Sequence, residues 1–466
     1  YFGTIRERQA AFMRELNDEL WKLGILSKTQ HNEVAPAQHE MAPIYSTANI
    51  ATDHNQLVME TMKKVARRHN FECLLHEKPF AGVNGSGKHD NWSLVTNTGK
   101  NLLSPGKTPY DNKQFLLFLS AVIAAVDDNA ALLRMSASNP GNDHRLGANE
   151  APPAIISIFL GEQLEDIVEQ ILQNGTATHS NKGERMDIGV HTIPPIKKDA
   201  TDRNRTSPFA FTGNKFEFRM VASSMSIAGA NTVLNATVAD VLQSMADRME
   251  KADDLDKTVD EIIYETLKEH QKVIFNGNGY SDEWIAEAEK RGLPNVKTMV
   301  DATASLLYPK TIEMFERQHV YTKTELESRA EINYEAYAKA INIEAKTMIH
   351  MASKEYIPAI ISYVTSLGDS INSISAACAE ADLSVQKDLL TTCSSLLAKA
   401  QTALYALKDA DKKANAMEEG KEQAEFFRDT VFTAMADLRA PIDELEMIVD
   451  KEYWPVPSYG DMLFEV

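Results

Sequence analysis

The sequence predicts an α+β protein in which a curved sheet backed by helices occupies residues 1–250 and a large helical region follows over residues 251–466. In the first part, short strand-like and helix-like segments are separated by Gly, Pro and Asn, which interrupt regular structure. From about residue 250 the chain becomes rich in Ala, Glu, Ile and Met and has long helical patterns. A chain of 466 residues also exceeds most single cores, so at least two structural units are expected.

Three segments of the first part have helical patterns of apolar residues, over residues 10–23, 58–68 and 115–126. The first two are amphipathic, as expected of helices with one face on a core. Residues 115–126 are almost wholly apolar, which indicates a buried helix. No apolar stretch reaches 18 residues, so we expect no membrane span.

Two other segments alternate polar and apolar side chains, as a β-strand with two different faces does. In residues 215–220 the polar positions are Lys215, Glu217 and Arg219, and the apolar positions are Phe216, Phe218 and Met220. Residues 89–94 likewise place His89, Asn91 and Ser93 on one face. A solvent-facing strand fits this pattern, and so does a strand whose charged face lines a cavity.

In the second part, helices are expected over residues 254–273, 282–291, 295–316, 326–367, 381–407 and 418–450. Thr322 and Glu325 have the spacing of a capping box, in which each side chain bonds the other residue's backbone. The polar stretch 409–415 suits the tip of a helical hairpin, and the tail from Trp454 is expected to be irregular. We expect this half to provide helical packing and an assembly surface.

The composition, with 43% hydrophobic and 25% charged residues, is that of a soluble globular protein. A formal charge of −19 argues against non-specific nucleic-acid binding, which requires Lys and Arg to neutralise phosphates. Cys73, Cys378 and Cys393 are too few and too scattered for a disulfide framework or a cysteine-based zinc site. A reducing, cytoplasmic setting is therefore the simplest expectation.

A first candidate motif spans residues 31–40, with the sequence HNEVAPAQHE. It differs from the zinc-protease motif in spacing, and Pro36 would break the helix that such a motif requires. Two extended arms meeting near Pro36 would let Glu33 and Glu40 converge. Carboxylates suit Mg²⁺ or Mn²⁺ rather than zinc. The alternative for these residues alone is a solvated turn.

A second motif is glycine-rich and covers residues 78–89, where exposed backbone N–H groups could cradle an anion. It does not match a P-loop, and a plain turn before a strand is the alternative. Two further motifs, residues 144–153 and 202–206, contain arginines whose planar fork suits carboxylate or phosphate oxygens. Each could equally be a surface loop with a salt bridge.

Taken together and in order, these motifs resemble the glutamine synthetase family. The matching segments are EVAPAQHE, NGSGKH, RLGANEAP, NRT and EFR. The sequence around them resembles the large type III bacterial class. The resemblance is strongest over residues 28–235. It implies a curved antiparallel sheet forming a funnel or barrel, with two or more Mg²⁺ or Mn²⁺ ions in each site and ATP as co-substrate.

By this resemblance, Glu33 and Glu40 would hold the metal near glutamate and ammonia. His89 and Glu217 would hold the metal that binds the ATP phosphates. Ser93 would lie on the nucleotide side of the site.

The resemblance also assigns the groups that handle substrate. Arg145 would bind the glutamate carboxylate, and Asn84 and Gly85 would contact glutamate through the loop. Arg205 would bind nucleotide and stabilise the phosphoryl group in transfer, and Arg219 would act on the same reacting end of the substrate. Glu150 would close the site and take a proton from ammonium.

Three features depart from the family pattern. The expected Glu-x-Glu metal pair does not occur between Tyr1 and His31, and the β-grasp domain that precedes it is not in the sequence, so we expect a chain truncated at Tyr1. The motif from Arg145 to Glu150 is one residue shorter than the common form. Ala210 stands where a second arginine is usual, and Lys215 is a candidate replacement on the nucleotide side.

The implied function is ATP-dependent ligation of ammonia to glutamate by a homo-oligomer of two stacked hexameric rings, a dodecamer. A ligase that joins glutamate to a larger amine and a non-catalytic relative are the alternatives. No nucleic-acid or membrane partner is expected.

Overall fold

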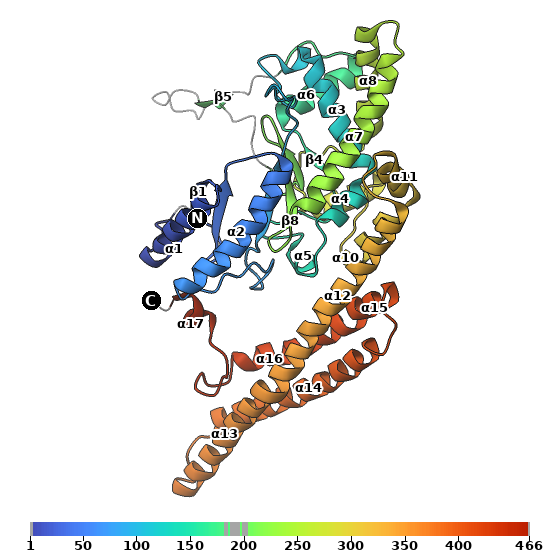
Figure 1. Ribbon diagram of the computed structural model, residues 1–466. Coiled ribbons are helices and arrows are strands. Elements are labelled where there is room, and N and C mark those ends of the chain that lie inside the picture. The colour runs from blue at the N-terminus through green and yellow to red at the C-terminus, as the bar shows by residue number, and fades with distance from the viewer. Residues whose placement is uncertain (1–2, 181–184, 187–195, 198–203, 465–466) are drawn as a thin grey trace. The chain divides into compact units, whose positions relative to one another are not determined.

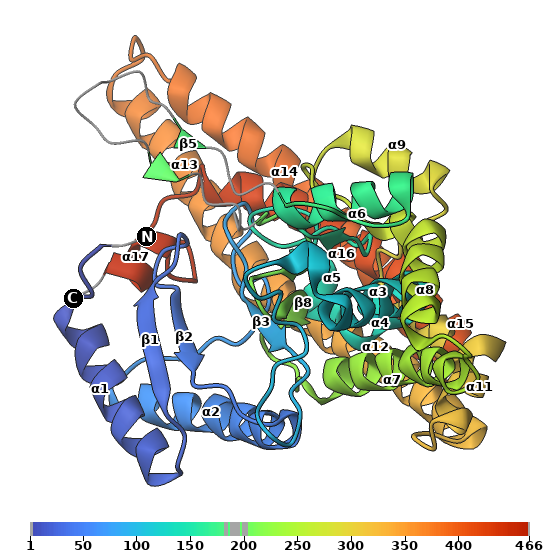
Figure 2. The same ribbon diagram turned by 90° about the horizontal axis from the view of Figure 1, so that it is seen from above.

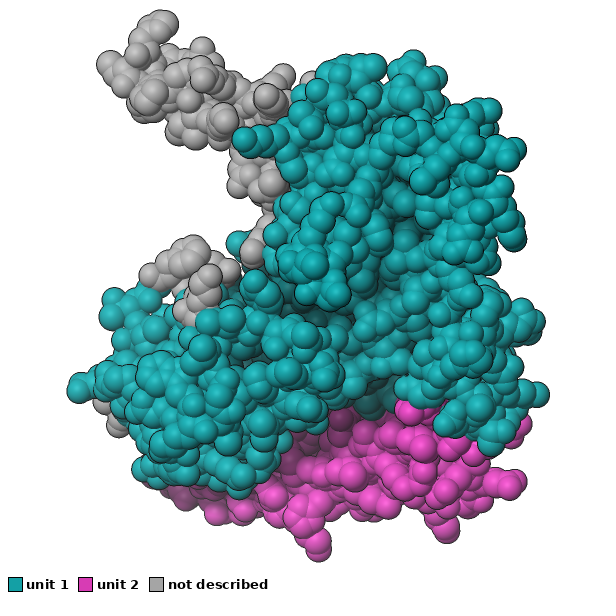
Figure 3. All heavy atoms as spheres, turned by 45° about the horizontal axis from the view of Figure 1, so that its top comes forward, with its two compact units in different colours: residues 1–327 teal, residues 328–466 magenta. Residues whose placement is uncertain are grey.

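The structure is a computed structural model that describes residues 3–180, 185–186, 196–197 and 204–464. The chain divides into two compact units, residues 1–327 and residues 328–466 (Figure 3). The sequence predicts a boundary near residue 250 between a catalytic part and a helical part. The first compact unit extends beyond that residue and includes helices up to residue 317. The division at residue 250 stays a prediction. Positions 202 and 203 of the fourth motif lie outside the described residues.

The main sheet of the first unit has four strands in the order β3-β8-β7-β4. Strands β4 and β8 are labelled in Figure 1. The strands are β3 (Gly87–Trp92), β8 (Phe216–Ala222), β7 (Phe209–Phe211) and β4 (Ile158–Phe159). The β3–β8 and β7–β8 pairs are antiparallel, as expected, whereas the short β4 joins β7 in parallel. Both strands predicted from polar–apolar alternation therefore exist and are neighbours.

Strand β8 is the centre of this sheet, and all seven of its residues are buried. Its phenylalanines pack against β7, with the rings of Phe209 and Phe216 stacked 4.8 Å apart. Glu217 and Arg219 on the other face are only 3% and 5% exposed. The solvent-facing alternative for residues 215–220 is therefore wrong. The alternation of polar and apolar residues could not show that both faces of the strand are covered.

Helix α3 (Lys113–Asp128) is buried along almost its whole length, as predicted, and packs against α7 (Ala228–Glu250) and α8 (Leu255–His270). A buried ion pair at 2.8 Å joins Asp127 of α3 to His270 of α8. The remaining helices here are α4 (Ala130–Ser136), α5 (Pro140–Arg145), α6 (Glu162–Asn174), α9 (Asp282–Lys290), α10 (Met299–Thr303) and α11 (Pro309–Arg317). Within the described residues, no single helix has the length and apolar character needed to cross a membrane, and only the sharply bent α3–α4 pair meets that test jointly.

A smaller layer contains α1 (Glu7–Lys22), α2 (Ala48–Arg68) and the antiparallel strands β1 (Ser27–Asn32) and β2 (His39–Pro43) (Figure 2). Both predicted helices are present, but α2 begins ten residues earlier than expected. Its buried residues, Val58, Met59, Val65 and Ala66, all lie in its second half, so only that half carries an amphipathic signal. Two further short strands, β5 (Arg185–Met186) and β6 (Ile196–Lys197), pair with each other.

The helices of the C-terminal half are α12 (Lys323–Met351), α13 (Ile357–Ala377), α14 (Ser384–Ala414), α15 (Lys421–Phe426), α16 (Phe432–Glu446) and α17 (Tyr459–Phe464). Helix α14 packs against α13 and α16 (Figure 1). The prediction of a hairpin tip at residues 409–415 is wrong, because α14 continues to Ala414. Ala410 and Ala414 are buried, so this polar run is an amphipathic end of the helix rather than a turn.

The predicted capping box at the start of α12 is confirmed. The Thr322 N–H donates to Glu325 Oε2 at 2.7 Å, and the Glu325 N–H donates to Thr322 Oγ1 at 3.3 Å. Two N–H groups that the helix itself cannot satisfy are thereby paired.

Replacing Thr322 by alanine should lower the free energy of unfolding by about 1 kcal/mol, because one of these N–H groups loses its acceptor. Chemical denaturation measures this change. Thr347→Ala is the matched control, since that hydroxyl bonds the Ile343 carbonyl within α12. Equal stability of the two variants would show that the box contributes nothing.

Candidate active site

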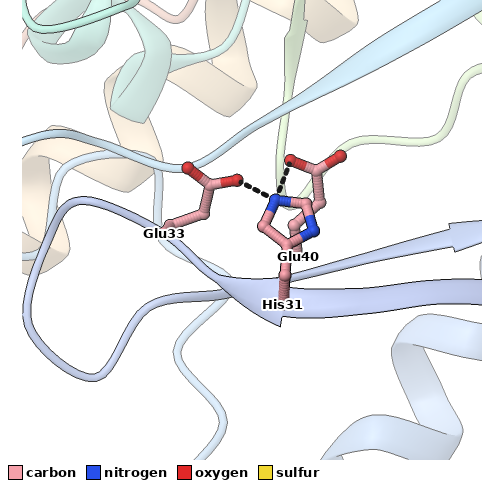
Figure 4. A group of neighbouring side chains, drawn as sticks. All are labelled: His31, Glu33 and Glu40. Carbon is pink, nitrogen blue, oxygen red and sulfur yellow. Dashed lines mark hydrogen bonds and ion pairs between the residues drawn. The ribbon is translucent and has the colours of Figure 1, made fainter. Parts of the chain in front are cut away.

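The β1–β2 hairpin brings three potential metal ligands together. His31 pairs with Glu40 across the two strands. The Glu33 N–H donates a hydrogen bond to the Gln38 carbonyl at 2.9 Å and closes the turn between them. His31 Nε2 lies 3.0 Å from Glu33 Oε1 and 3.6 Å from Glu40 Oε2, and the ligand atoms of all three residues lie within 4.8 Å of one another (Figure 4). The expected convergence of two extended arms near Pro36 is thus present. His31 was not singled out as a ligand from the sequence.

The electrostatics of this cluster suit a cation. Burial raises the pKa of Glu33 from its usual 4.5 to about 8, with further contributions from the hydrogen bond and charge of Glu40 and from the charge of Glu150. Carboxylates forced together in this way repel when ionised, and a divalent cation between them removes the repulsion. The donor set of two carboxylates and one imidazole therefore fits a hard divalent metal.

A second pair, His89 and Glu217, comes from the main sheet. The register of β3 against β8 shifts between Lys88 and Asp90, and the resulting bulge includes His89. His89 Nδ1 lies 3.4 Å from Glu217 Oε1. The imidazole and the carboxylate, on adjacent strands, are therefore close enough to bind one metal ion together.

The predicted nucleotide-side residues Ser93 and Lys215 lie where β3 ends and β8 begins. Ser93 Oγ donates to the Asn214 carbonyl at 2.9 Å, and Lys215 Nζ donates to Thr212 Oγ1 at 2.8 Å. Both side chains therefore lie at the β7–β8 turn.

Arg145, predicted to bind a carboxylate, is 4% exposed. Its guanidinium donates to the carbonyls of Arg219, Met220 and Val221 of β8 over 3.3–3.4 Å. A Cβ added at Gly87 would lie 2.0 Å from Arg145 Nη2, so only glycine allows this approach. In this structure the guanidinium binds the backbone of the sheet, and its role toward substrate stays a prediction.

The charge opposite Arg145 comes from Glu77, a residue that the sequence motifs did not indicate. Glu77 is 2% exposed, and its Oε1 accepts hydrogen bonds from the N–H, at 3.0 Å, and the hydroxyl of Ser224. Its backbone carbonyl accepts the Ser86 N–H at 2.8 Å. Burial lowers the pKa of Arg145 to about 10, and the charge of Glu77 acts in the opposite direction. Only long-range packing reveals this residue.

Glu150 joins two of the motifs. Its Oε2 accepts from Asn84 Nδ2 at 3.1 Å, and its Oε1 accepts from Arg205 Nη1 at 2.5 Å. Asn149 and Glu150 both have left-handed backbone angles, with φ of 54° and 67°. Such a conformation is unfavourable for a side chain with a Cβ, and it directs the Glu150 carboxylate toward both partners.

Gly85 and Arg219 are held beside these groups. Gln38 Nε2 donates to the Gly85 carbonyl at 2.7 Å, which ties the β1–β2 turn to the glycine-rich motif. Arg219 Nη1 donates to the Asn204 carbonyl at 2.9 Å, which ties β8 to the NRT segment.

Sequence profiles and relatives identify the family. The profile "Glutamine synthetase, catalytic domain" matches residues 2–155, and "Glutamine synthetase C-terminal domain" matches residues 258–375. Over its whole length the chain is 46% identical to a glutamine synthetase of Butyrivibrio fibrisolvens and 44% identical to a type-3 glutamine synthetase of Dictyostelium discoideum. The chain belongs to the glutamine synthetase family. It spans 66% and 64% of the length of these two relatives.

A further glutamine synthetase, from Bacteroides fragilis, is 42% identical over the whole chain, which covers 65% of it. Among solved structures, ligand-free GmaS aligns with 72% of the chain at 16% identity and a TM-score of 0.45, with 60% of that structure covered. The whole-chain identities to the three glutamine synthetases confirm the family resemblance inferred from the motifs.

Substitution of Gly87 by alanine should lower the free energy of unfolding by about 2 kcal/mol, because the new Cβ overlaps the Arg145 guanidinium. Denaturant titration tests this expectation. Gly229→Ala in α7 is the control, because a Cβ there meets the Ser136 carbonyl at 3.5 Å, an ordinary contact. Wild-type stability of the Gly87 variant would show that the guanidinium moves freely.

The raised pKa of Glu33 predicts a pH dependence of stability in metal-free protein. The folded state holds the Glu33 proton more tightly than the unfolded state does. The contribution of this carboxyl to the free energy of unfolding is therefore present at low pH and declines as pH rises from about 4.5 to about 8. Melting temperatures of wild type and Glu33→Gln across this range should therefore diverge, with the variant gaining relative to wild type. Parallel curves would contradict the predicted titration.

Proposed function

We propose that this protein catalyses the ATP-dependent ligation of ammonia to L-glutamate, giving L-glutamine, ADP and phosphate through γ-glutamyl phosphate. Membership of the glutamine synthetase family supports this proposal. The structural observation that carries it is the contact of Glu150 with both Asn84 and Arg205, which links a proposed proton acceptor to a substrate loop and a phosphate-binding arginine.

The reaction needs activation because a carboxylate has no good leaving group. Transfer of the γ-phosphoryl group of ATP to glutamate supplies one, and ammonia then displaces phosphate. In the proposed site Arg205 and Arg219 neutralise charge on the reacting phosphoryl and carboxylate oxygens. Glu150 accepts the proton that ammonium must lose before its nitrogen can attack.

Divalent Mg²⁺ or Mn²⁺ ions, when bound, would neutralise phosphate charge and polarise the transferring group. Glu33 and Glu40, with His31 beside them, would hold one ion, and His89 and Glu217 another. Two or more such ions per site are part of the proposal.

The remaining predicted roles concern positioning. Asn84, Gly85 and Arg145 would hold glutamate, and Ser93 and Lys215 would face the nucleotide. Closure of the segment around Glu150 would exclude water, which otherwise hydrolyses the acyl phosphate.

We also propose a cytoplasmic enzyme that assembles as two stacked hexameric rings. The family resemblance supports the assembly, and the few scattered cysteines support the compartment.

Phosphate release by the full-length protein with Mg²⁺ and ATP should require both glutamate and ammonium and should produce glutamine. Glu217→Ala should reduce this turnover at least about 100-fold, because a proposed metal ligand is lost. Glu261→Ala, which removes an exposed carboxylate of α8, is the control.

Full activity of the Glu217 variant would refute the site assignment. Faster turnover with polyamines than with ammonium would instead show a different ligase. ATP binding by wild type without any turnover would show a non-catalytic relative.

A further inference from the structure

A loop that none of the sequence motifs covers is anchored to the candidate active site. This loop, residues 276–280, has the sequence NGNGY. At one end, Asn276 Oδ1 accepts the Leu160 N–H at 2.9 Å, beside the end of β4. At the other end, the Gly279 N–H donates to Thr206 Oγ1 at 2.7 Å. The loop is therefore fixed to the segment that carries the proposed phosphate-binding arginine.

Close packing at Gly279 fixes the loop further. A Cβ added there would lie 2.7 Å from the Thr206 carbonyl oxygen and 3.4 Å from Pro153 Cγ. The absence of a side chain lets the loop fit between the NRT segment and the segment that follows Glu150. The next residue, Tyr280, consequently has a defined position.

The hydroxyl of Tyr280 is buried, and no group among the described residues makes a hydrogen bond of normal geometry with it. The Glu150 backbone is near the phenol oxygen, and the charges of Arg219, Glu150 and Arg145 act on it. Burial raises the pKa of Tyr280 above its usual 10, so the phenol keeps its proton and remains a hydrogen-bond donor.

A buried hydroxyl without a partner destabilises a folded protein, so each such group requires an explanation. The charges that act on this hydroxyl include those of Arg219 and Arg145, which are positive, and that of Glu150, which is negative. An anionic ligand beside it would accept the hydrogen bond of the unpaired donor.

We propose that the Tyr280 hydroxyl binds the amino-acid substrate by donating a hydrogen bond to one of its carboxylate oxygens, beside Arg219. This inference rests on the proposed function and adds a substrate-binding residue to it. In this proposal the NGNGY loop positions the Tyr280 hydroxyl at the substrate.

Tyr280→Phe in the full-length protein removes only the hydroxyl. We expect the KM for glutamate to rise about tenfold or more, since a hydrogen bond to a charged group is lost, while the KM for ATP stays within about twofold. The melting temperature of the ligand-free variant should equal or exceed that of wild type, because an unsatisfied buried group is gone. Tyr308→Phe, at a tyrosine that is 41% exposed, is the control.

A wild-type KM for glutamate in the Tyr280 variant would overturn the inference while leaving the proposed function intact. A lower melting temperature together with that unchanged KM would indicate a purely structural hydrogen bond. If wild type releases no glutamate-dependent phosphate, the proposed function fails and this inference fails with it.

Discussion

The burial of the Arg145 guanidinium is the constraint on which the rest of the candidate site depends. A cation removed from water must be compensated by nearby dipoles and an opposite charge. Three carbonyls of β8 provide the dipoles, and Glu77 provides the charge. Because Arg145 ends α5 and Glu77 accepts a hydrogen bond from Ser86, this arrangement fixes a helix, the glycine-rich motif and the central strand to one another.

Polar contacts hold the loops of the site to this centre. Gln38 binds the Gly85 carbonyl, Arg219 binds the Asn204 carbonyl, and Glu150 connects Asn84 to Arg205. Each contact joins segments far apart in the sequence. Loss of any one would therefore change the relative position of groups to which the proposed reaction assigns a common substrate.

Local patterns in the sequence predicted the elements whose signal is local. Period and composition located α3, and spacing alone located the Thr322–Glu325 capping box. The alternation in residues 215–220 correctly placed Glu217 and Arg219 on one strand but could not show that this strand is central. The end of α14 was missed because buried alanines at its polar end give a weak apolar signal. Glu77 and Tyr280 were not recognised because their environment is made by residues distant in the chain. His31 lies inside a recognised motif, beside Glu33 and Glu40, and was not singled out as a ligand.

At Glu150, the left-handed backbone conformation lowers stability while it holds a carboxylate to which we assign a role in the proposed reaction. Asparagine tolerates this conformation, whereas glutamate does so at a cost of about 1–2 kcal/mol. Glycine at position 150 would relieve that cost and delete the carboxylate that contacts Asn84 and Arg205. Directed evolution for thermal tolerance alone would therefore favour discarding this side chain, so a library built on this scaffold needs a selection for turnover as well as for heat resistance.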